Sequence, residues 1–465
     1  MAHHHCKDFS RSALLRGAAA EGVAVAGRGL PAIEAGMPTP AGTGLSRRSL
    51  LLRSAGLAVS VYGASALRLD ALGAGVAQAA TGPEAPIVVS VFLEGGADSL
   101  SILAPTGDPR YRRLRPHLAL PESAGSAFAE DDRLRWHPSA RGISELHSEG
   151  KVTVFPAIGY DHPDQSHFTS RHYWEVGSLD ARASTGWLGR YLDQTGSPDN
   201  PLQGLALDGR LSPALATARV PVAAVDDPGE FDFWSRGVWG EIEELMLDAF
   251  GDIGAGHAGG DAALSYAGNV AAQAGSLRRQ LLPFKNDGEE DSSTSAAPGY
   301  PKGEFAQRLA GLSEMIAAGL PLRCVAVQAA GEYDTHDNQE EDFDRDLQST
   351  ADSLLAFQRD LEARGLADRV LVHVWSEFGR RAEENGSNGT DHGAGGVSFL
   401  IGTRVRGQMV GEFPGLERGL DADGNLRATS DFRSLYCSVL EQWLGVDAAP
   451  IIPGAARYAR PALLE

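Results

Sequence analysis

Leu371 to Gly407 reads LVHVWSEFGRRAEENGSNGTDHGAGGVSFLIGTRVRG, and this stretch decides the fold class. Its first apolar run ends in an acid, Glu377. A loop rich in glycine and asparagine then carries Asp391 and His392, before a second apolar run ends at Gly402. In an open α/β sheet, side chains just past the carboxyl ends of strands point into the ligand crevice. An acid and an Asp-His pair at such a place predict metal ligands on a rigid frame.

Other apolar runs complete the pattern of a mostly parallel sheet. Runs without strict alternation suit strands that are buried on both faces. A helical pattern from Asp342 to Arg364 precedes the LVHVW run, and a second helix is expected over Arg433 to Leu444, after the capping residues Thr429 to Asp431. Strand, helix and strand in succession predict an α/β fold. The runs predicted as strands are Pro86 to Leu93, Lys151 to Ile158, Arg323 to Ala330 and Arg369 to Trp375.

Two regions interrupt this pattern. Leu202 to Phe250 holds short mixed segments that we leave unassigned. Lys285 to Gly303 is polar and rich in proline, glycine and serine, which predicts a mobile surface loop. We expect both to lie within one domain over residues 80–465.

The amino end has the pattern of an export signal. Arg47 and Arg48 form a twin-arginine pair, the apolar stretch Ser54 to Leu67 follows, and Ala77-Gln78-Ala79 offers a cleavage site. The stretch is too short to span a bilayer, so no stable membrane span is expected. The alternative is an alanine-rich helix that contains Arg-Arg by chance.

Residues 1–79 are therefore predicted to be a twin-arginine signal region that is removed after export. The Tat translocase is the expected partner, and the mature protein is expected in the periplasm or outside the cell. Met37 is a candidate true start, which would place residues 1–36 upstream of the protein. The histidines at positions 3–5 are not counted as a metal site.

The mature part is strongly acidic. Residues 1–79 hold eight basic and four acidic residues, so their removal changes the formal charge from −20 to −24. This charge argues against nucleic acid and anionic membranes as partners. Only Cys324 and Cys437 remain, each in an apolar run, which favours buried free thiols over a disulfide framework.

Four clusters of polar residues follow predicted strands or lie near them. Carboxylate oxygens and imidazole nitrogens suit Zn²⁺, Mn²⁺ or similar ions, and mixed sets are typical of hydrolytic metal sites. The clusters are Asp98; Ser166 with His167; Asp334 with His336; and Glu377 with Asp391 and His392.

Each cluster also has a structural interpretation. Asp98, after two glycines, is equally consistent with a helix N-cap. Ser166 and His167 could cap and pack the helix that follows them, because a serine without an evident base is usually structural. Glu377 could form an ion pair with Arg380 or Arg381. A solvated loop explains the acids near Asp334, but it does not require His336.

In order, the chain carries SRRSLL, FLEGGADSL, DQSHF, TGWLGRYL, GEYDTH, LLAFQRDL, WSEFGRR, NGTDHGAGG and TSDFRSLY. Together these motifs resemble the bacterial, Tat-exported family called domain of unknown function 1501, over roughly Arg47 to Gly445. That family is grouped with the alkaline phosphatase-like superfamily, which includes sulfatases and phosphodiesterases. The resemblance implies a three-layer α/β/α sandwich with a mostly parallel sheet, one or two metal ions and a hydroxyl nucleophile.

The resemblance also implies roles for single residues. Asp98 matches the metal ligand after the first strand, and Ser166 falls in the order expected for the nucleophile. Glu377 and Phe378 stand where the superfamily has Asp-His. Phenylalanine cannot ligate a metal, so the site of Asp98, Glu377 and Ser166 is weakened, vacant, or completed by Asp391 or His167.

The other site implied by the resemblance consists of Asp334, His336 and His392. These three ligands would leave an open position for water or substrate. The resemblance thus predicts a metal-dependent hydrolase of phosphate or sulfate esters, in which Arg380 stabilises negative charge in the transition state. Its substrate would be a small anionic ester or one linked to a polysaccharide. Zn, Mn, Ca and Mg are not distinguished.

Two other classes of function remain open. The Phe378 replacement is also consistent with a superfamily member that has lost catalysis and serves as an exported binding or assembly protein. A serine hydrolase of carboxylic esters is disfavoured, because the chain has no G-x-S-x-G elbow.

Overall fold

The computed structural model describes residues 85–226, 241–256, 262–284 and 298–465. The predicted signal region over 1–79 lies outside these residues and stays a prediction. Most of the predicted loop, residues 285–297, also lies outside them, so its mobility stays a prediction. Residues 298–303 lead into α10 (Glu304–Ala317). The region left unassigned from the sequence contains two short strands, β6 (Gly204–Ala206) and β7 (Ala223–Ala224).

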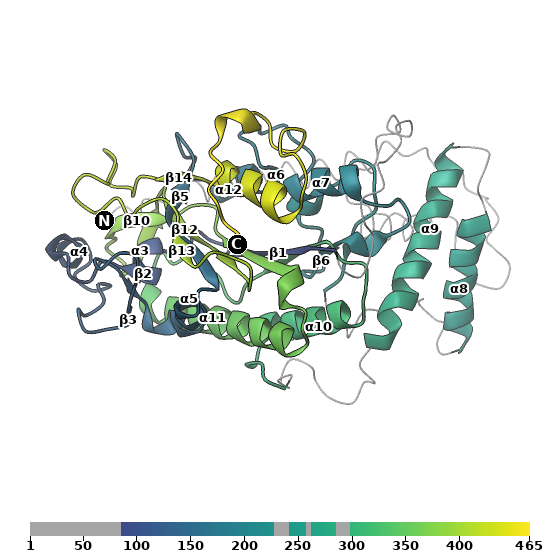
Figure 1. Cartoon of the computed structure of the whole chain (residues 1–465), viewed down its shortest axis with the longest axis horizontal. Coiled ribbons are helices and arrows are strands. Elements are labelled where there is room, and N and C mark those ends of the chain that lie inside the picture. The colour runs from purple at the N-terminus through teal and green to yellow at the C-terminus, as the bar shows by residue number, and fades with distance from the viewer. Residues whose placement is uncertain (1–84, 227–240, 257–261, 285–297) are drawn as a thin grey trace, which may run out of the picture. The chain divides into compact units, whose positions relative to one another are not determined.

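Nine strands of the described residues form one mixed sheet, in which most neighbours run parallel (Figure 1). At its centre, β1 (Ile87–Phe92) pairs in parallel with β8 (Cys324–Gln328) and β9 (Val370–Trp375). The strand β12 (Gly396–Ile401) runs antiparallel to β9 and to β5 (Val152–Gly159). The order is β13–β5–β12–β9–β1–β8–β6–β7, with β14 (Ser430–Asp431) also beside β5, and β13 spans Gln408–Met409.

The central strands have the burial that their composition predicts. Every residue of β1, β5 and β9 is buried, because helices cover both faces of the sheet. All four runs predicted as strands are confirmed as β1, β5, β8 and β9.

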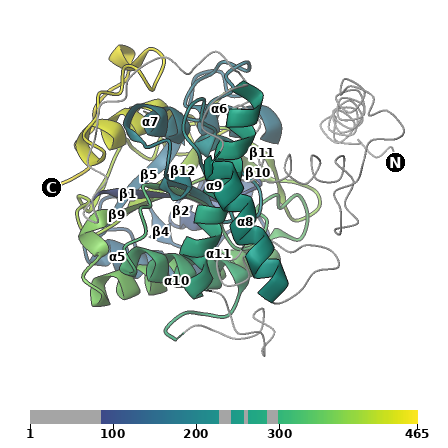
Figure 2. The ribbon, with the colours of Figure 1, turned by 90° about the vertical axis from the view of Figure 1, so that its right-hand side faces the viewer.

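Helices cover the sheet in two layers (Figures 1 and 2). One layer contains α10 with α5 (Arg141–Ser148) and α11 (Gln339–Ala363). The other contains α6 (His167–Val176), α7 (Trp187–Thr195) and α12 (Phe432–Ser438). The predicted three-layer sandwich is therefore confirmed. The predicted helix from Arg433 to Leu444 is α12 followed by a π-helical turn, and Asp431 caps it as expected.

An aromatic layer joins α6 and α12 to the sheet. The ring of Trp174, on α6, stacks on Trp375 of β9 and on Phe432 of α12, with centroids 5.5 and 4.6 Å apart. Trp187 stacks on Tyr436 at 4.2 Å. Large aromatic side chains dominate core energetics and pack in few geometries, so this layer fixes α6 against the strand ends.

The remaining named elements surround this sandwich or lie outside its sheet. In the part of the chain that the structure describes, no helix is both long and apolar enough to cross a bilayer. The elements are α3 (Ser99–Ile102), β2 (Leu103–Ala104), α4 (Pro109–Leu114), β3 (Ser126–Ala127), β4 (Arg135–Trp136), α8 (Glu241–Gly256), α9 (Ala262–Leu281), β10 (Arg380–Glu384) and β11 (Thr390–His392).

A buried ion pair anchors the segment after β1. Asp98 and Arg115 are fully buried, and both carboxylate oxygens accept from the guanidinium, at 2.5 and 2.9 Å. Burial raises the pKa of Asp98, but Arg115 outweighs this effect and the pKa lies below its ordinary value. Arg115 also donates to the carbonyls of Arg381 and Ala382, so the pair ties the end of β1 to β10.

We predict that Arg115→Leu lowers the free energy of unfolding by about 3–5 kcal/mol, because it leaves the Asp98 carboxylate buried without its partner. Denaturant unfolding monitored by circular dichroism measures the change. Arg112→Leu, on the helix α4 that ends just before Arg115, is the matched control, because Arg112 is partly exposed and lies 3.6 Å from an exposed acid. Equal stability of the two variants would contradict this account of the pair.

Candidate functional site

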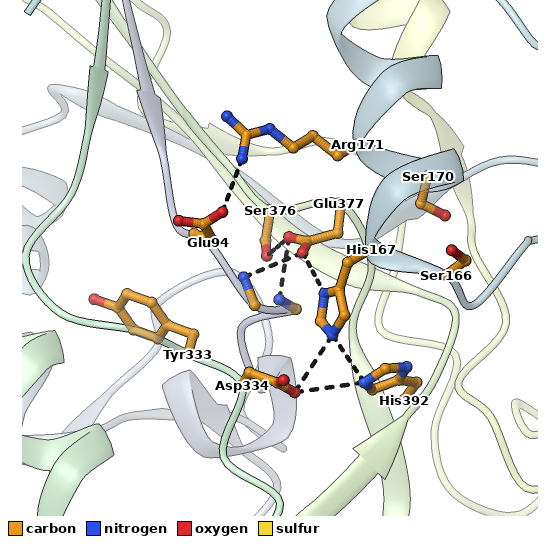
Figure 3. Close-up of polar contacts among 12 residues, drawn as sticks. Glu94, Ser166, His167, Ser170, Arg171, Tyr333, Asp334, Ser376, Glu377 and His392 are labelled. Carbon is orange, nitrogen blue, oxygen red and sulfur yellow. Dashed lines mark hydrogen bonds and ion pairs between the residues drawn. The ribbon is translucent and has the colours of Figure 1, made fainter. Parts of the chain in front are cut away.

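Four side chains of the types that bind metals converge past the carboxyl ends of the central strands, and Figure 3 shows three of them, His167, Asp334 and His392. His167 is the first residue of α6, Asp334 and His336 follow β8, and His392 ends β11. The structure thus brings together the three ligands predicted for one site and adds His167, which the sequence offered as a residue that could complete the other site. We call Asp334, His167, His336 and His392 the His₃Asp cluster.

The ligand atoms of His167, Asp334 and His392 all lie within 4.8 Å of one another, which is close enough for one metal ion, and His336 adds a nitrogen close to two of them. His392 Nε2 is 2.9 Å from Nε2 of His167 and 2.9 Å from Nε2 of His336. Oδ1 of Asp334 is 3.1 Å from Nε2 of His336 and 3.4 Å from the same atom of His167 and of His392. In a tetrahedral zinc site with bonds of about 2.0–2.1 Å, ligand atoms lie about 3.3 Å apart.

The outer ring nitrogens fix which nitrogen of each imidazole faces the cluster centre. His392 Nδ1 lies 2.8 Å from the Gln165 carbonyl, which can only accept, so this nitrogen carries the hydrogen. His167 Nδ1 lies 2.7 Å from Glu377 Oε1, and the same argument applies to it. In the neutral rings, Nε2 of both histidines therefore points a lone pair at the shared centre. An imidazole that donates its other N–H to an oxygen is the usual arrangement of metal-bound histidine.

His336 follows the same pattern with a longer contact. Its Nδ1 lies 3.3 Å from Asp391 Oδ1, and the Asn385 amide donates to its backbone carbonyl at 2.8 Å. The glycine- and asparagine-rich loop supplies this support. A Cβ on Gly389 would lie 2.3 Å from the His336 carbonyl carbon, so only glycine permits this approach.

The electrostatics of the cluster favour a cation. Burial raises the pKa of Asp334, but hydrogen bonds from the three imidazoles and Arg380 hold it far below its ordinary value. Burial lowers the pKa of His167, but the contacts with Asp334 and Glu377 raise it to about 9. Both directions mean that these carboxylates attract positive charge to the cluster.

Glu377 orients a ligand and does not face the centre. It is buried, and it accepts from the N–H groups of Gly95 and Gly96 at 3.1 Å as well as from His167. These contacts give no support to its predicted role as a metal ligand, because its carboxylate meets Nδ1 of His167 and not the centre. Gly95 has φ of +115°, and a Cβ there would lie 2.2 Å from the Asp334 nitrogen, so glycine lets this segment approach the site.

Two further predicted metal ligands have other partners. Asp391 contacts Nδ1 of His336, the nitrogen on the far side of the ring from the cluster centre. Asp98 binds Arg115 with both oxygens and caps α3, so its helix-capping interpretation describes the structure. Neither side chain faces the centre of the cluster.

Arg380 positions Asp334 from inside the protein. Its guanidinium is fully buried, donates to Asp334 Oδ1 at 2.6 Å, and gives its other hydrogens to the carbonyls of Gly95, Gly96, Tyr333 and Thr390. These contacts give no support to its predicted role in the transition state, because its donors are directed at backbone carbonyls and at Asp334.

Ser166 and Phe378 border the cluster in different ways. Ser166 is the N-cap residue of α6, but its side chain forms no capping hydrogen bond, and no contact is drawn from it in Figure 3. The buried ring of Phe378 packs on His167 and His392, with centroids 4.9 Å from each. Phe378 thus packs an apolar ring against the cluster at the position where the superfamily has a histidine.

Sequence reasoning missed the oxygen and nitrogen atoms that hold the ligands in place. The Gln165 carbonyl gave no signal, because any residue supplies a carbonyl. The Gly95-Gly96 pair was a signal, since two glycines after a strand permit close backbone approach. Arg115 gave none, because its partner is set by the path of the chain.

Comparison with known proteins gives a family and distant structural similarity. A family model described as Protein of unknown function (DUF1501) matches residues 161–452, which contain the whole His₃Asp cluster. No curated protein matches the chain.

Among solved structures, an alkaline phosphatase superfamily protein from Vibrio parahaemolyticus has 10% identity and a TM-score of 0.35, with 87% of this chain and 80% of that chain covered. The C-terminal periplasmic domain of EptC from Escherichia coli, in complex with Zn, has 9% identity and a TM-score of 0.36, with 84% and 96% covered. Ps i-CgsB in complex with a neocarrahexaose has 10% identity and a TM-score of 0.37, with 82% and 75% covered.

We predict that Glu377→Gln weakens metal affinity about 10- to 100-fold, because the amide no longer orients His167 as a carboxylate does. Competition with a chromophoric zinc chelator measures the affinity. Glu383→Gln, at an exposed glutamate of β10, is the matched control and should leave affinity unchanged. An unchanged affinity in Glu377→Gln would show that its contact with His167 has no bearing on metal binding.

Proposed function

This chain belongs to the DUF1501 family, whose description assigns no activity, and from its geometry we propose that it is a metal-dependent hydrolase of phosphate or sulfate esters. The observation that carries the proposal is that Nε2 of His392 and Oδ1 of Asp334 each lie 2.9–3.4 Å from one another and from Nε2 of His167 and of His336. We propose that these four side chains hold one divalent ion.

The donor set favours some ions over others. Three imidazole nitrogens and one carboxylate oxygen suit zinc, manganese, iron and similar ions, whereas magnesium and calcium prefer oxygen ligands. The oxygens that bind the outer nitrogens of the three rings support the same choice.

The surroundings of the cluster suit a reaction with a solvent-borne ester. The side chains of Asp334 and His336 are 30% and 36% exposed, so one side of the cluster is open to substrate. A bound divalent ion supplies a Lewis acid for ester cleavage. The chain's own residues hold the ligands: Arg380 fixes Asp334, and Glu377 fixes His167. Ser166, next to His167, stays the proposed nucleophile, with water as its competitor.

A second function has one specific observation in its favour. Four protein ligands fill a tetrahedral site, whereas catalytic zinc sites usually keep one position open. On this alternative, the chain is a catalytically degenerate binding or assembly protein whose metal stabilises the loops around it. Turnover separates the two proposals.

We predict that the purified protein contains about one equivalent of metal and cleaves at least one member of a panel of phosphomonoesters, phosphodiesters and sulfate esters. Asp334→Ala should lose both the metal and the turnover, since it removes the only carboxylate among the four proposed ligands. Metal content is measured by elemental analysis. His167→Ala should behave similarly, whereas His172→Ala, on the same helix and outside the cluster, is its matched control.

The outcomes separate the candidate roles. If the wild-type protein contains metal and Ser166→Ala still turns over substrate, water and not Ser166 attacks the ester. Metal without turnover across the panel supports the binding protein. Wild-type protein with neither metal nor affinity for added zinc or manganese would rule out both.

We also propose that the chain is exported by the twin-arginine pathway and acts in the periplasm or outside the cell on a small or polysaccharide-linked ester. The twin-arginine pair, the apolar stretch Ser54 to Leu67 and the cleavage site Ala77-Gln78-Ala79 support export. In a bacterial host, replacing Arg47 and Arg48 together by lysine should retain the protein in the cytoplasm in its unprocessed form. Fractionation followed by immunoblotting measures this, and export of the variant equal to wild type would contradict the proposal.

A further inference from the structure

A polar cavity of about 200 Å³ lies between α6 and the sheet. Its inner wall comes from the sheet face that also carries the aromatic layer, with Phe92 of β1 and Trp375 of β9. The opposite wall comes from α6, and the rim comes from the segment between β6 and β7. The lining side chains that matter here are Glu94, Arg171, Glu175, Asp208, Arg210 and Ser212.

Three short segments of the chain run from the lining of the cavity to the His₃Asp cluster or to Glu377, which contacts it. Arg171 follows His167 by one turn of α6, a distance of about 6 Å along the helix. Glu94 directly precedes Gly95, whose N–H donates to Glu377. Trp375 lies two residues before Glu377 on the same segment. Figure 3 shows the Arg171–Glu94 pair beside the contact between Glu377 and His167.

The guanidinium of Arg171 is already neutralised within the cavity. It donates to Glu94 at 2.8 Å and to Glu175 at 3.0 Å, and it lies over the Phe92 ring at 4.5 Å. Asp208 adds a third carboxylate, and Arg210 at the rim is the second guanidinium. Burial raises the pKa of Glu175 to about 7, and Arg308 lies 3.6 Å from Asp208, so positive and negative groups nearly balance and the cavity favours an uncharged ligand group over a charged one.

The lining contains both guanidinium donors and carboxylate acceptors, and this mixture favours a ligand hydroxyl over a ligand ammonium group. A hydroxyl donates to a carboxylate and accepts from a guanidinium, so it satisfies both kinds of lining side chain. An ammonium group satisfies the carboxylates alone and faces Arg171 and Arg210. The apolar faces of Phe92 and Trp375 suit the C–H face of a saturated ring. At about 30 Å³ for each water, the volume equals about six or seven waters, which is room for one ring.

We propose that this cavity binds a single neutral, hydroxyl-rich ring, as the part of the ester substrate that does not react. The inference rests on the proposed function, in that the ester group attached to this ring would reach the His₃Asp cluster next to the cavity. The substrate class is then a sugar or polyol ester in which the reacting phosphate or sulfate is the sole anionic group near the ring.

Ligand binding tests this without turnover. Methyl glucoside, methyl galactoside and methyl mannoside are titrated against the full mature protein and followed by saturation-transfer NMR. At least one should bind, and glucuronate and glucosamine should bind at least tenfold more weakly than the best neutral ring. Ser212→Phe should weaken binding at least tenfold, because it fills the rim. Ser212 caps the short 3₁₀ turn Pro213–Leu215 without a side-chain hydrogen bond, so its replacement removes no contact of that kind.

Ser148→Phe is the matched control, at an exposed serine of α5 in the helix layer on the other face of the sheet, and should leave binding unchanged. Circular dichroism checks that Ser212→Phe is folded; if it is not, Asp208→Asn replaces it, with a smaller but measurable loss of affinity expected. Asp334→Ala should still bind the neutral ring, since the cavity contains no metal ligand. Metal content and turnover therefore test the hydrolase proposal, whereas ring binding tests the cavity proposal. Either proposal can fail while the other holds.

Three results would overturn the inference. The first is that wild-type protein binds none of the three neutral glycosides. The second is that a cavity variant that is folded binds the ring as tightly as wild type. The third is that glucuronate or glucosamine binds more tightly than every neutral ring, which would assign the cavity to a charged ligand.

Discussion

Nε2 of His392 and Oδ1 of Asp334 each lie within 3.4 Å of the other three ligand atoms, and this crowding is the constraint on which the rest of the site depends. Imidazole lone pairs that face one centre beside a carboxylate repel each other, and a proton on His167, whose pKa is raised to about 9, offsets part of this repulsion when no ion is bound. The fold holds them there through contacts on the outer side of each ring: a carboxylate for His167, a carboxylate for His336 and a backbone carbonyl for His392. A cation at the centre turns this repulsion into attraction.

The surrounding structure holds the four side chains of the cluster close together. The aromatic layer under α6 fixes the start of that helix, and with it His167. Phe378 closes the site from below with an apolar ring, while the N–H groups of Gly95 and Gly96 satisfy the buried charge of Glu377. Arg380 and Arg115 link separate segments through backbone carbonyls and one carboxylate each. Two buried guanidiniums thus stiffen the frame, while the open side of the cluster keeps its ligands partly exposed.

The sequence predicted the frame better than the roles of individual acids. Continuous apolar runs identified β1, β5, β8 and β9, because burial on both faces leaves a local pattern. Acids after these strands could be located but not assigned. Asp98 and Asp334 both follow a central strand, yet Asp98 meets a guanidinium 17 residues later and Asp334 meets three imidazoles. Glu377 orients a ligand because glycines some 280 positions away donate to it, and no spacing rule encodes such a contact. His167 was selected as a candidate, but its role as a proposed ligand depends on where α6 begins in space.

X-ray absorption spectroscopy at the metal edge tests the central claim most directly, because it reports the kind and number of atoms bound to the ion. For protein loaded with one equivalent of zinc or manganese, we expect a first shell with about three imidazole nitrogens and at least one oxygen, and with the outer-shell scattering of histidine rings. In Asp334→Ala, the oxygen contribution should fall or the ion should be lost. A first shell of oxygen atoms alone in the wild-type protein, without imidazole scattering, would contradict the account.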